Sequence, residues 1–318
     1  MTQQSAFEYL SHGQIPFFRL PVAPVAAGVP PGTGAVLLGV PYDGGTTYQP
    51  GARFAPFEVR RVSALVQGYH PSHRVAVFDH LSAVDGGNVV FPPFDAAAVR
   101  DRVERGVGAV LAAGAVPFIV GGDHSVALPS LRAVARRHGP VAVVHVDAHL
   151  DTSGPETWGE LFHHGTPFRH AIEEGLVAKG QLHQVGLRGP WRDDHDAEPG
   201  AAHGARVYSV DDLADRGVSA VAAEIRSALG HRPVYLSFDV DAVDPAFAPG
   251  TGTPVPGGLT SREALQLVRG LAGAALVGMD VVEVCPPLDH ADLTSHLAAH
   301  LLFEGLALAA LGPALHGT

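Results

Sequence analysis

Short apolar runs, rich in β-branched residues, recur along the chain and predict the strands of a buried sheet. Most of these runs are apolar on both faces, which is typical of parallel strands covered by helices on both sides. Most of them also end in a small or polar residue. The expected strands are residues 35–40, 75–79, 116–120, 141–146, 183–187, 206–210, 234–238 and 276–284.

Segments rich in alanine and leucine lie between these runs and predict helices. They cover residues 96–113, 128–137, 219–228, 261–271 and 294–311. Alternating strands and helices predict a three-layer α/β/α sandwich with a mainly parallel central sheet of about eight strands. No Pro- or Ser-rich linker, charge block or internal repeat divides the chain. We therefore expect a single domain over residues 1–318, in which residues 1–33 form an N-terminal extension that packs on the domain or on a neighbouring subunit.

The amino-acid composition disfavours some classes of binding partner. Hydrophobic residues make up 46% of the chain and charged residues 17%, as in globular proteins with a large core. The formal net charge of −11 disfavours nucleic acid and anionic lipid, and mildly favours cationic ligands. Cys285 is the single cysteine, so no intrachain disulfide can form. The N-terminal segment does not resemble a signal peptide and no long uncharged apolar run occurs, so we expect a cytoplasmic protein without membrane partners.

Three polar clusters follow three of the expected strands. They read GGDHS from residue 121, HVDAHLD from residue 145 and SFDVDAVDP from residue 237. Side chains two positions apart on an extended chain share a face, and working residues of such sheets gather at the carboxyl ends of the strands. We therefore expect six acids and imidazoles to converge. They are His124, Asp147, His149, Asp151, Asp239 and Asp241.

Four carboxylates and two imidazoles in one place would repel each other or remain unsatisfied unless cations lie among them. The set is large enough for two metal ions with bridging carboxylates. Carboxylate-rich mixed sites suit Mn²⁺, so we expect two Mn²⁺ per subunit, with Ni²⁺, Co²⁺ or Zn²⁺ as alternatives. Each cluster alone could be an ordinary cap or turn. All three together, at the ends of buried strands, favour a metal centre.

These motifs resemble the three signatures of the ureohydrolases, the family of arginases, agmatinases and their relatives. The likeness continues through residues 44–56 (GGTTYQPGARFAP), 163–169 (HHGTPFR), 245–259 (PAFAPGTGTPVPGGL) and 280–287. The resemblance implies a three-layer α/β/α fold, a binuclear manganese centre and hydrolysis of a guanidino group to urea and an amine. It also implies a homo-oligomer, either a trimer or a hexamer.

The expected chemistry explains this choice of residues. A guanidinium carbon is a poor electrophile because resonance spreads its charge over three nitrogens. Attack needs hydroxide at neutral pH, which two divalent ions provide by lowering the pKa of a shared water. Asp151, as a bridging ligand, could take a proton from that water.

Two further residues resemble catalytic residues of the family. Glu283 lies at a strand end, in the position of the acid that binds the guanidinium, where a carboxylate can pair two N–H groups. His164, directly before Gly165, resembles the mobile-loop histidine that protonates the departing amine, a role that suits an ordinary pKa of about 6.5. The alternatives are a helix-cap acid and a solvated loop histidine. The adjacent His163 is a second candidate donor, but the histidine next to the glycine is the better match.

The substrate tail is expected to be read by the loops 152–163 and 189–203. Arginases carry an Asn-bearing segment after the second motif and an acid after the later Gly-Leu-Arg, and neither is present here, which argues against arginine. Glu160 is acidic and the first loop has no basic residue, which favours a cationic tail and agmatine, with putrescine as product. Arg192 in the second loop keeps guanidino acids open. These are 4-guanidinobutyrate, 3-guanidinopropionate and proclavaminate-type compounds.

Two readings of another class remain. The chain could be a non-catalytic subunit of a mixed ureohydrolase oligomer, although all six expected ligands are intact. It could be a nucleotide-binding α/β protein, but no Gly-x-Gly-x-x-Gly follows the first expected strand and no Gly-Lys-Ser/Thr loop occurs.

Overall fold

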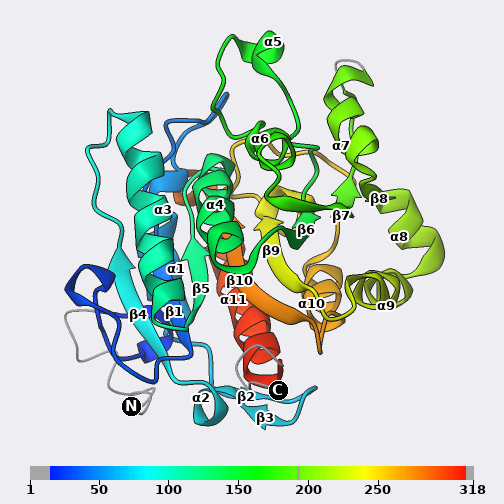
Figure 1. Cartoon of the computed structure of the whole chain (residues 1–318). Coiled ribbons are helices and arrows are strands. Elements are labelled where there is room, and N and C mark those ends of the chain that lie inside the picture. The colour runs from blue at the N-terminus through cyan, green and yellow to red at the C-terminus, as the bar shows by residue number, and fades with distance from the viewer. Residues whose placement is uncertain (1–14, 192–193, 313–318) are drawn as a thin grey trace.

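A sheet of eight parallel strands forms the centre of the computed structural model, which describes residues 15–191 and 194–312 (Figure 1). The order across the sheet is β4-β1-β5-β10-β9-β6-β7-β8, and every neighbouring pair is parallel. The strands are β1 (Ala35–Gly39), β4 (Ala83–Asn88), β5 (Val116–Val120), β6 (Val141–Val146), β7 (Val177–Leu187), β8 (Arg206–Ser209), β9 (Pro233–Asp239) and β10 (Ala275–Val282).

Helices cover both faces of the sheet, which confirms the expected three layers (Figure 1). One face carries α3 (Ala96–Ala112), α4 (Ala127–His138), α6 (Pro167–Glu173) and α7 (Glu198–His203). The other face carries α1 (Ala55–Ser63), α9 (Val218–Leu229), α10 (Ser261–Arg269) and α11 (Leu293–Leu311), while α8 (Val210–Arg216) lies beside β8 and α9.

The strands are apolar on both faces because each face buries side chains under a different set of helices. In β6, Val141 and Val143 belong to the apolar cluster that contains α3, α4 and α6. Ala142, Val144 and Val146 alternate with them and belong to the cluster that contains α9, α10 and α11. The period of two along a strand thus divides the core into two layers.

One expected strand is wrong and one real strand was missed. Residues 75–79 do not enter the central sheet: β3 (Val75–Ala76) pairs with β2 (Tyr69–His70) in a small antiparallel hairpin, and α2 (Val77–His80) follows. The edge position belongs instead to β4, which pairs with β1. Its sequence AVDGGN has a short apolar part and two glycines, so apolar periodicity does not reveal it.

The first described residues pack on the domain itself. Phe17 and Phe18 are fully buried, and the Phe17 N–H donates to Asp85 of β4 at 2.9 Å. The Arg19 guanidinium is also buried and donates to the carbonyl of Val66 at 3.2 Å. This part of the expected N-terminal extension therefore lies against β4 and the end of α1.

Helix α11 is long and apolar enough to cross a membrane by length and composition alone. Most of it is buried inside the protein, and it contacts α1, α10 and β10. Within the described chain it is the single helix that meets this criterion, and its burial is that of a core helix.

The hairpin β2–β3 is fastened to α11 by a buried polar cluster. His70 Nε2 lies 2.9 Å from Glu304 Oε2, and Glu304 also pairs with Arg269. The backbone N–H of His73 donates to His70 Nδ1 at 3.2 Å, which places the remaining ring proton on Nε2. His70, His73 and Glu304 are close enough to hold a cation. His70 Nε2 carries a proton and Arg269 pairs with Glu304, so these contacts form an internal clamp between the hairpin and α11, while His73 Nε2 is buried without a hydrogen-bond partner.

Candidate metal centre and active site

The strand order brings the predicted site residues together. Strands β5, β10, β9 and β6 are neighbours in the middle of the sheet. His124 follows β5, Glu283 follows β10 directly, Asp239 is the last residue of β9, and Asp147 follows β6 directly. All four side chains are buried, with at most 3% of any residue exposed. Four separate segments therefore converge at the carboxyl edge of the sheet.

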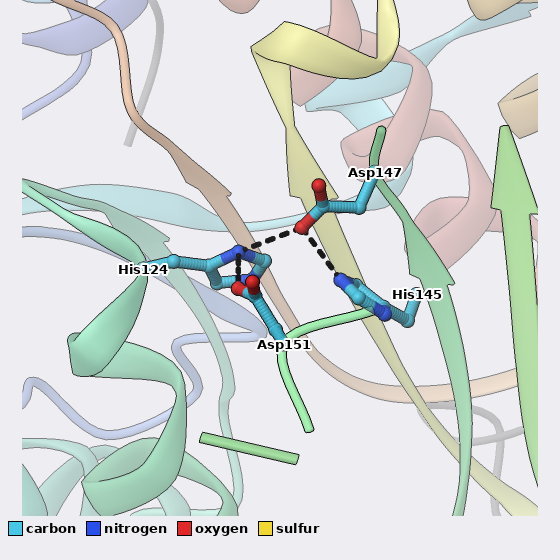
Figure 2. Close-up of side chains that lie close together, drawn as sticks. All are labelled: His124, His145, Asp147 and Asp151. Carbon is cyan, nitrogen blue, oxygen red and sulfur yellow. Dashed lines mark hydrogen bonds and ion pairs between the residues drawn. The ribbon is translucent and has the colours of Figure 1, made fainter. Parts of the chain in front are cut away.

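His124 lies at the first of two candidate metal positions (Figure 2). Its Nδ1 atom is 2.9 Å from Asp151 Oδ2 and 3.1 Å from Asp147 Oδ2. The same atom is 3.2 Å from Asp239 Oδ2. Although it is buried, Nδ1 makes no hydrogen bond to any of these oxygens. One unpaired nitrogen thus faces three carboxylate oxygens, which is the arrangement expected around a cation.

The hydrogen bond of His124 Nε2 determines which ring nitrogen carries the proton and which carries the free lone pair. Tyr235 Oη donates to Asp280 Oδ2 at 2.6 Å, and Ser237 Oγ donates to Asp280 Oδ1 at 2.7 Å. Ser237 Oγ therefore accepts from His124 Nε2, 2.8 Å away, so the Nε2 atom carries the proton. The free Nδ1 lone pair then points at carboxylate oxygens, a repulsive contact unless a cation lies between.

The three carboxylates around His124 favour a positive charge between them, and this raises the pKa of the His124 ring. Burial alone would lower the pKa of His124, but Asp147, Asp151 and Asp239 together hold it well above its usual value. A divalent ion would supply this charge without protonating the ligand.

The second candidate position is centred on His149. Its Nδ1 lies 3.0 Å from Asp241 Oδ2 and 3.4 Å from Asp147 Oδ1. Asp147 therefore presents Oδ2 to His124 and Oδ1 to His149, as a carboxylate that bridges two cations would. The arrangement fits two metal ions. Each of the six residues predicted from the sequence contributes an atom to one or both positions.

The crowding of carboxylates supports the same conclusion. Burial raises the pKa of Asp239 well above its usual value, and the charges of Asp241 and Asp147 raise it further. Burial also raises the pKa of Asp241. Several neighbouring carboxylates cannot all remain ionised in a buried site without a cation. The chemistry of these side chains therefore fits metal ions and is poorly explained without them.

Asp151 and Glu283 are held in a backbone conformation that is uncommon for residues other than glycine. Their φ angles are 51° and 61°, in the left-handed region. The surrounding hydrogen bonds enforce it: the Phe168 N–H donates to the Asp151 carbonyl at 3.1 Å, and the Glu283 N–H donates to the Gly122 carbonyl at 2.9 Å. Such strain persists where the surroundings over-determine it, and is frequent at functional sites.

Gly122 in the first motif is required by a close approach of two loops. A Cβ atom at this position would lie 1.4 Å from the carbonyl oxygen of Tyr42. The next residue, Asp123, donates its N–H to the same carbonyl at 2.9 Å and accepts from the Gly45 N–H at 2.7 Å. The glycine therefore lets the loop after β5 fasten the loop after β1 over the site.

His164 and Glu283, the two predicted catalytic residues, form an ion pair. His164 Nδ1 lies 2.9 Å from Glu283 Oε1, and His164 Nε2 lies 2.7 Å from Thr47 Oγ1. Glu283 Oε1 also accepts from the backbone N–H of His124 at 2.8 Å. Burial would lower the pKa of His164, but the charge of Glu283 and its hydrogen bond raise the pKa to about 9. The pairing with Glu283 therefore favours the protonated form of His164.

His163, the alternative donor, has different surroundings. Its Nδ1 accepts from the Gly165 N–H at 3.1 Å, and burial followed by the charge of His164 lowers its pKa. The ring is therefore neutral near pH 7 and holds the loop, while its Nε2 atom is buried without a hydrogen-bond partner. The two histidines therefore have different surroundings, with His164 beside Glu283 and His163 bonded within its own loop.

A pocket of about 300 Å³ opens over the metal positions. Its floor contains four predicted ligands, and its walls come from several loops. The residues on the walls include Thr47, Ser153, Thr157, Trp158, His163, His164, Pro190, Trp191, Asp196 and Thr253. Glu283 is not on the pocket surface, because it lies behind His164.

The predicted tail-binding residues do not reach this pocket in the described part of the chain. Glu160 is exposed and is absent from the pocket walls, because its segment after α5 (Pro155–Trp158) turns its carboxylate toward solvent. Arg192 lies outside the described residues. Apart from the predicted metal ligands, the acid that lines the pocket is Asp196, which sequence reasoning missed because nothing in the local pattern distinguishes it from its acidic neighbours.

His145 is a second residue that was missed, although it lies within the second motif. Its Nε2 is 2.7 Å from Asp147 Oδ2 (Figure 2). Its ring packs on Phe168 with centroids 3.9 Å apart. Gln184 Nε2 donates to His145 Nδ1 at 3.2 Å, so Nε2 carries the proton and donates to Asp147. A protonated nitrogen cannot ligate a metal. His145 therefore orients Asp147, and its spacing of two from that ligand was the available signal.

The fold and the site define a parallel α/β/α protein with a candidate binuclear metal centre at the carboxyl edge of its sheet. The arginase family model matches residues 33–307, so the chain belongs to the arginase family. Three relatives are similar over most of their length. Proclavaminate amidinohydrolase of Streptomyces clavuligerus is 47% identical over 300 residues, which cover 92% of this chain and 94% of that protein. Its solved structure has a TM-score of 0.87 at 45% identity and covers 94% of this chain and 98% of its own.

The names of the other two relatives indicate different substrates. Guanidinopropionase of Pseudomonas aeruginosa is 45% identical and covers 92% of this chain and 91% of its own length. Mitochondrial agmatinase of Gallus gallus is 41% identical and covers 93% of this chain and 86% of its own length. The chain is therefore a hydrolase of C–N bonds in linear amidines that acts on guanidino compounds.

Proposed function

We propose that this enzyme hydrolyses agmatine to putrescine and urea. The observation that carries the proposal is the charge of the pocket: no Lys or Arg lies on its described walls, whereas Asp196 does. A cationic tail would meet a favourable potential there, and a carboxylate tail would meet an acid. The overall charge of −11 also favours a cationic substrate over an anionic one.

The carboxylate-rich ligand set supports Mn²⁺ as the resident metal, two per subunit. When bound, the two ions would supply a nucleophile at neutral pH and neutralise charge on the developing intermediate. His124 and His149 would each anchor one ion, and Asp147 would face both. We further propose a homo-oligomer, trimeric or hexameric, as the family resemblance implies.

His164 and Glu283 act on the substrate in the proposed function. A protonated His164 faces the pocket and can give its proton to the departing amine. Glu283 anchors the guanidinium through charged hydrogen bonds. His164 is paired with that carboxylate, so a guanidinium bound to Glu283 would replace His164 as its cationic partner.

The second candidate is a guanidino acid hydrolase. It is favoured by the names of two relatives, proclavaminate amidinohydrolase and guanidinopropionase, which are more similar to this chain than the agmatinase is. It would need a cation at the tail, and Arg192 is the residue in the sequence that could provide one.

A urea-release assay of the Mn²⁺-loaded protein tests the proposal. The panel contains agmatine, 4-guanidinobutyrate, 3-guanidinopropionate and arginine, each over a range of concentrations. We expect kcat/KM for agmatine to exceed the others by at least about tenfold, a difference of about 1.4 kcal/mol in transition-state binding. A guanidino acid as the best substrate would overturn the agmatine proposal. No urea from any member, with two metals bound per chain, would indicate the silent-subunit alternative.

A further inference from the structure

The far wall of the pocket holds an acid whose role the metal centre does not explain. Asp196 ends a short 3-10 helix, Asp194–Asp196, between β7 and α7. It lines the pocket that opens over Asp239 and Asp241, but it belongs to neither metal position. The question is therefore what its carboxylate binds.

Asp196 lacks a partner for one of its carboxylate oxygens. Oδ1 is buried and has no hydrogen-bond partner. The nearby Arg169 does not supply one, since its guanidinium pairs with Glu173 at 2.7 Å and with Glu156 at 3.6 Å. An unpaired buried carboxylate oxygen is costly unless a ligand satisfies it.

The backbone of Asp196 is fixed relative to the metal centre. Thr152 Oγ1 donates to the Asp196 carbonyl, and Thr152 directly follows the predicted ligand Asp151. Thr152 is fully buried, so this link does not depend on an exposed side chain. The position of the Asp196 carboxylate is therefore tied to the floor of the pocket where a guanidino group would lie.

Two indole rings line the same wall. Trp158 is 61% exposed and Trp191 is 45% exposed, and both lie on the pocket surface with Asp196. Exposed tryptophan is unfavourable in water, but it binds an ammonium group well through its ring face. An acid and two indoles on the surface of one pocket can together recognise an organic cation.

We propose that Asp196, together with Trp158 and Trp191, is the subsite that binds the cationic end of the substrate. This inference rests on the proposed function and deepens it, because it assigns the choice of a guanidino-alkylamine to one carboxylate. Asp196 attracts an ammonium tail and repels a carboxylate tail by the same charge. It is a specificity-determining residue, remote from the bond that breaks.

The test compares two substrates that differ only at the tail. Agmatine ends in an ammonium group, and N-pentylguanidine replaces that group with a methyl. The ratio of their kcat/KM values is measured for the Mn²⁺-loaded wild type and for Asp196→Asn. We expect the variant to lower this ratio about ten- to a hundredfold, mainly through KM for agmatine, because one charged hydrogen bond is lost. Glu198→Gln, which removes an exposed charge two residues away outside the pocket, is the matched control and should leave the ratio unchanged.

The outcomes separate the two proposals. If the wild type turns over agmatine but Asp196→Asn lowers both substrates equally, or neither, the subsite is wrong and the proposed function stands. If the wild type fails on agmatine and turns over a guanidino acid, the proposed function fails and the subsite with it. Asp196→Lys gives a second measurement: the subsite predicts a gain on 4-guanidinobutyrate relative to agmatine, which a structural role of Asp196 would not produce.

Discussion

The His164 ring covers the Glu283 carboxylate, with Nδ1 2.9 Å from Oε1, so the expected guanidinium anchor is paired with the expected proton donor. Both side chains are largely buried. The same contact raises the pKa of His164 to about 9 against the effect of burial. This ion pair therefore favours the protonated form of His164 and shields the Glu283 carboxylate.

The pH dependence of kcat/KM should follow His164. Because its folded pKa is raised, the protonated form and its pairing with Glu283 are fully present below about pH 6.5 and are lost as the pH rises through about 9. We expect the rate to fall above that pH. His164→Asn should lower kcat by roughly 10²- to 10⁴-fold and abolish this alkaline limb. His163→Asn should keep the limb, since burial lowers the pKa of His163. A limb near pH 9 that persists in His164→Asn would assign it to another group.

Asp147 should matter for both metal ions. Its two oxygens face His124 and His149, so Asp147→Ala removes a ligand from each position. We expect the bound metal, measured by elemental analysis after gel filtration, to fall from two per chain to near zero, with urea release lost. Asp101→Ala, which removes an exposed acid on α3, should keep two metals. Full metal content in Asp147→Ala would contradict the bridging role.

Gln184 is not a predicted metal ligand, but it should affect metal affinity through His145 and Asp147. Its amide holds the His145 ring in the tautomer that donates to Asp147, so Gln184→Leu frees that ring. Loss of such an orienting residue costs about 10- to 100-fold in metal affinity. The measurement is an Mn²⁺ titration of metal-free protein. Gln266→Leu on the exposed face of α10 is the control. Equal affinities for the two variants would show that His145 does not need Gln184.

The clamp around Glu304 should contribute to stability and not to chemistry. Glu304→Ala leaves buried His70 and partly buried Arg269 without their acceptor, and should lower the free energy of unfolding by about 3 kcal/mol. Urea denaturation at pH 7 measures this. Removal of the exposed Asp101–Arg105 pair should change it by less than about 0.5 kcal/mol. Loss of metal from folded Glu304→Ala would instead favour a ligand role for this cluster.

The sequence by itself determined much of the protein. Strands apolar on both faces specify a parallel sheet between two helical layers, since each face must be buried. The motifs after the strands correctly predicted that Asp147, His149, Asp151, Asp239 and Asp241 lie at one site. The expectation of an extended chain with these side chains on one face was wrong, because Asp151 has a left-handed backbone and Asp241 lies in a 3-10 helix, so that Asp239 and Asp241 face different metal positions.

Tertiary structure decided what depends on distant segments. Strand β4 holds its edge through pairing with β1, although its own residues have little strand character. The order of β5, β10, β9 and β6 joins four motifs into one site. Packing around Glu283 gave His164, and not His163, the raised pKa. Loop folding brought Asp196 to the pocket and left Glu160 outside. These outcomes follow from contacts between residues far apart in the chain, and no local pattern encodes them.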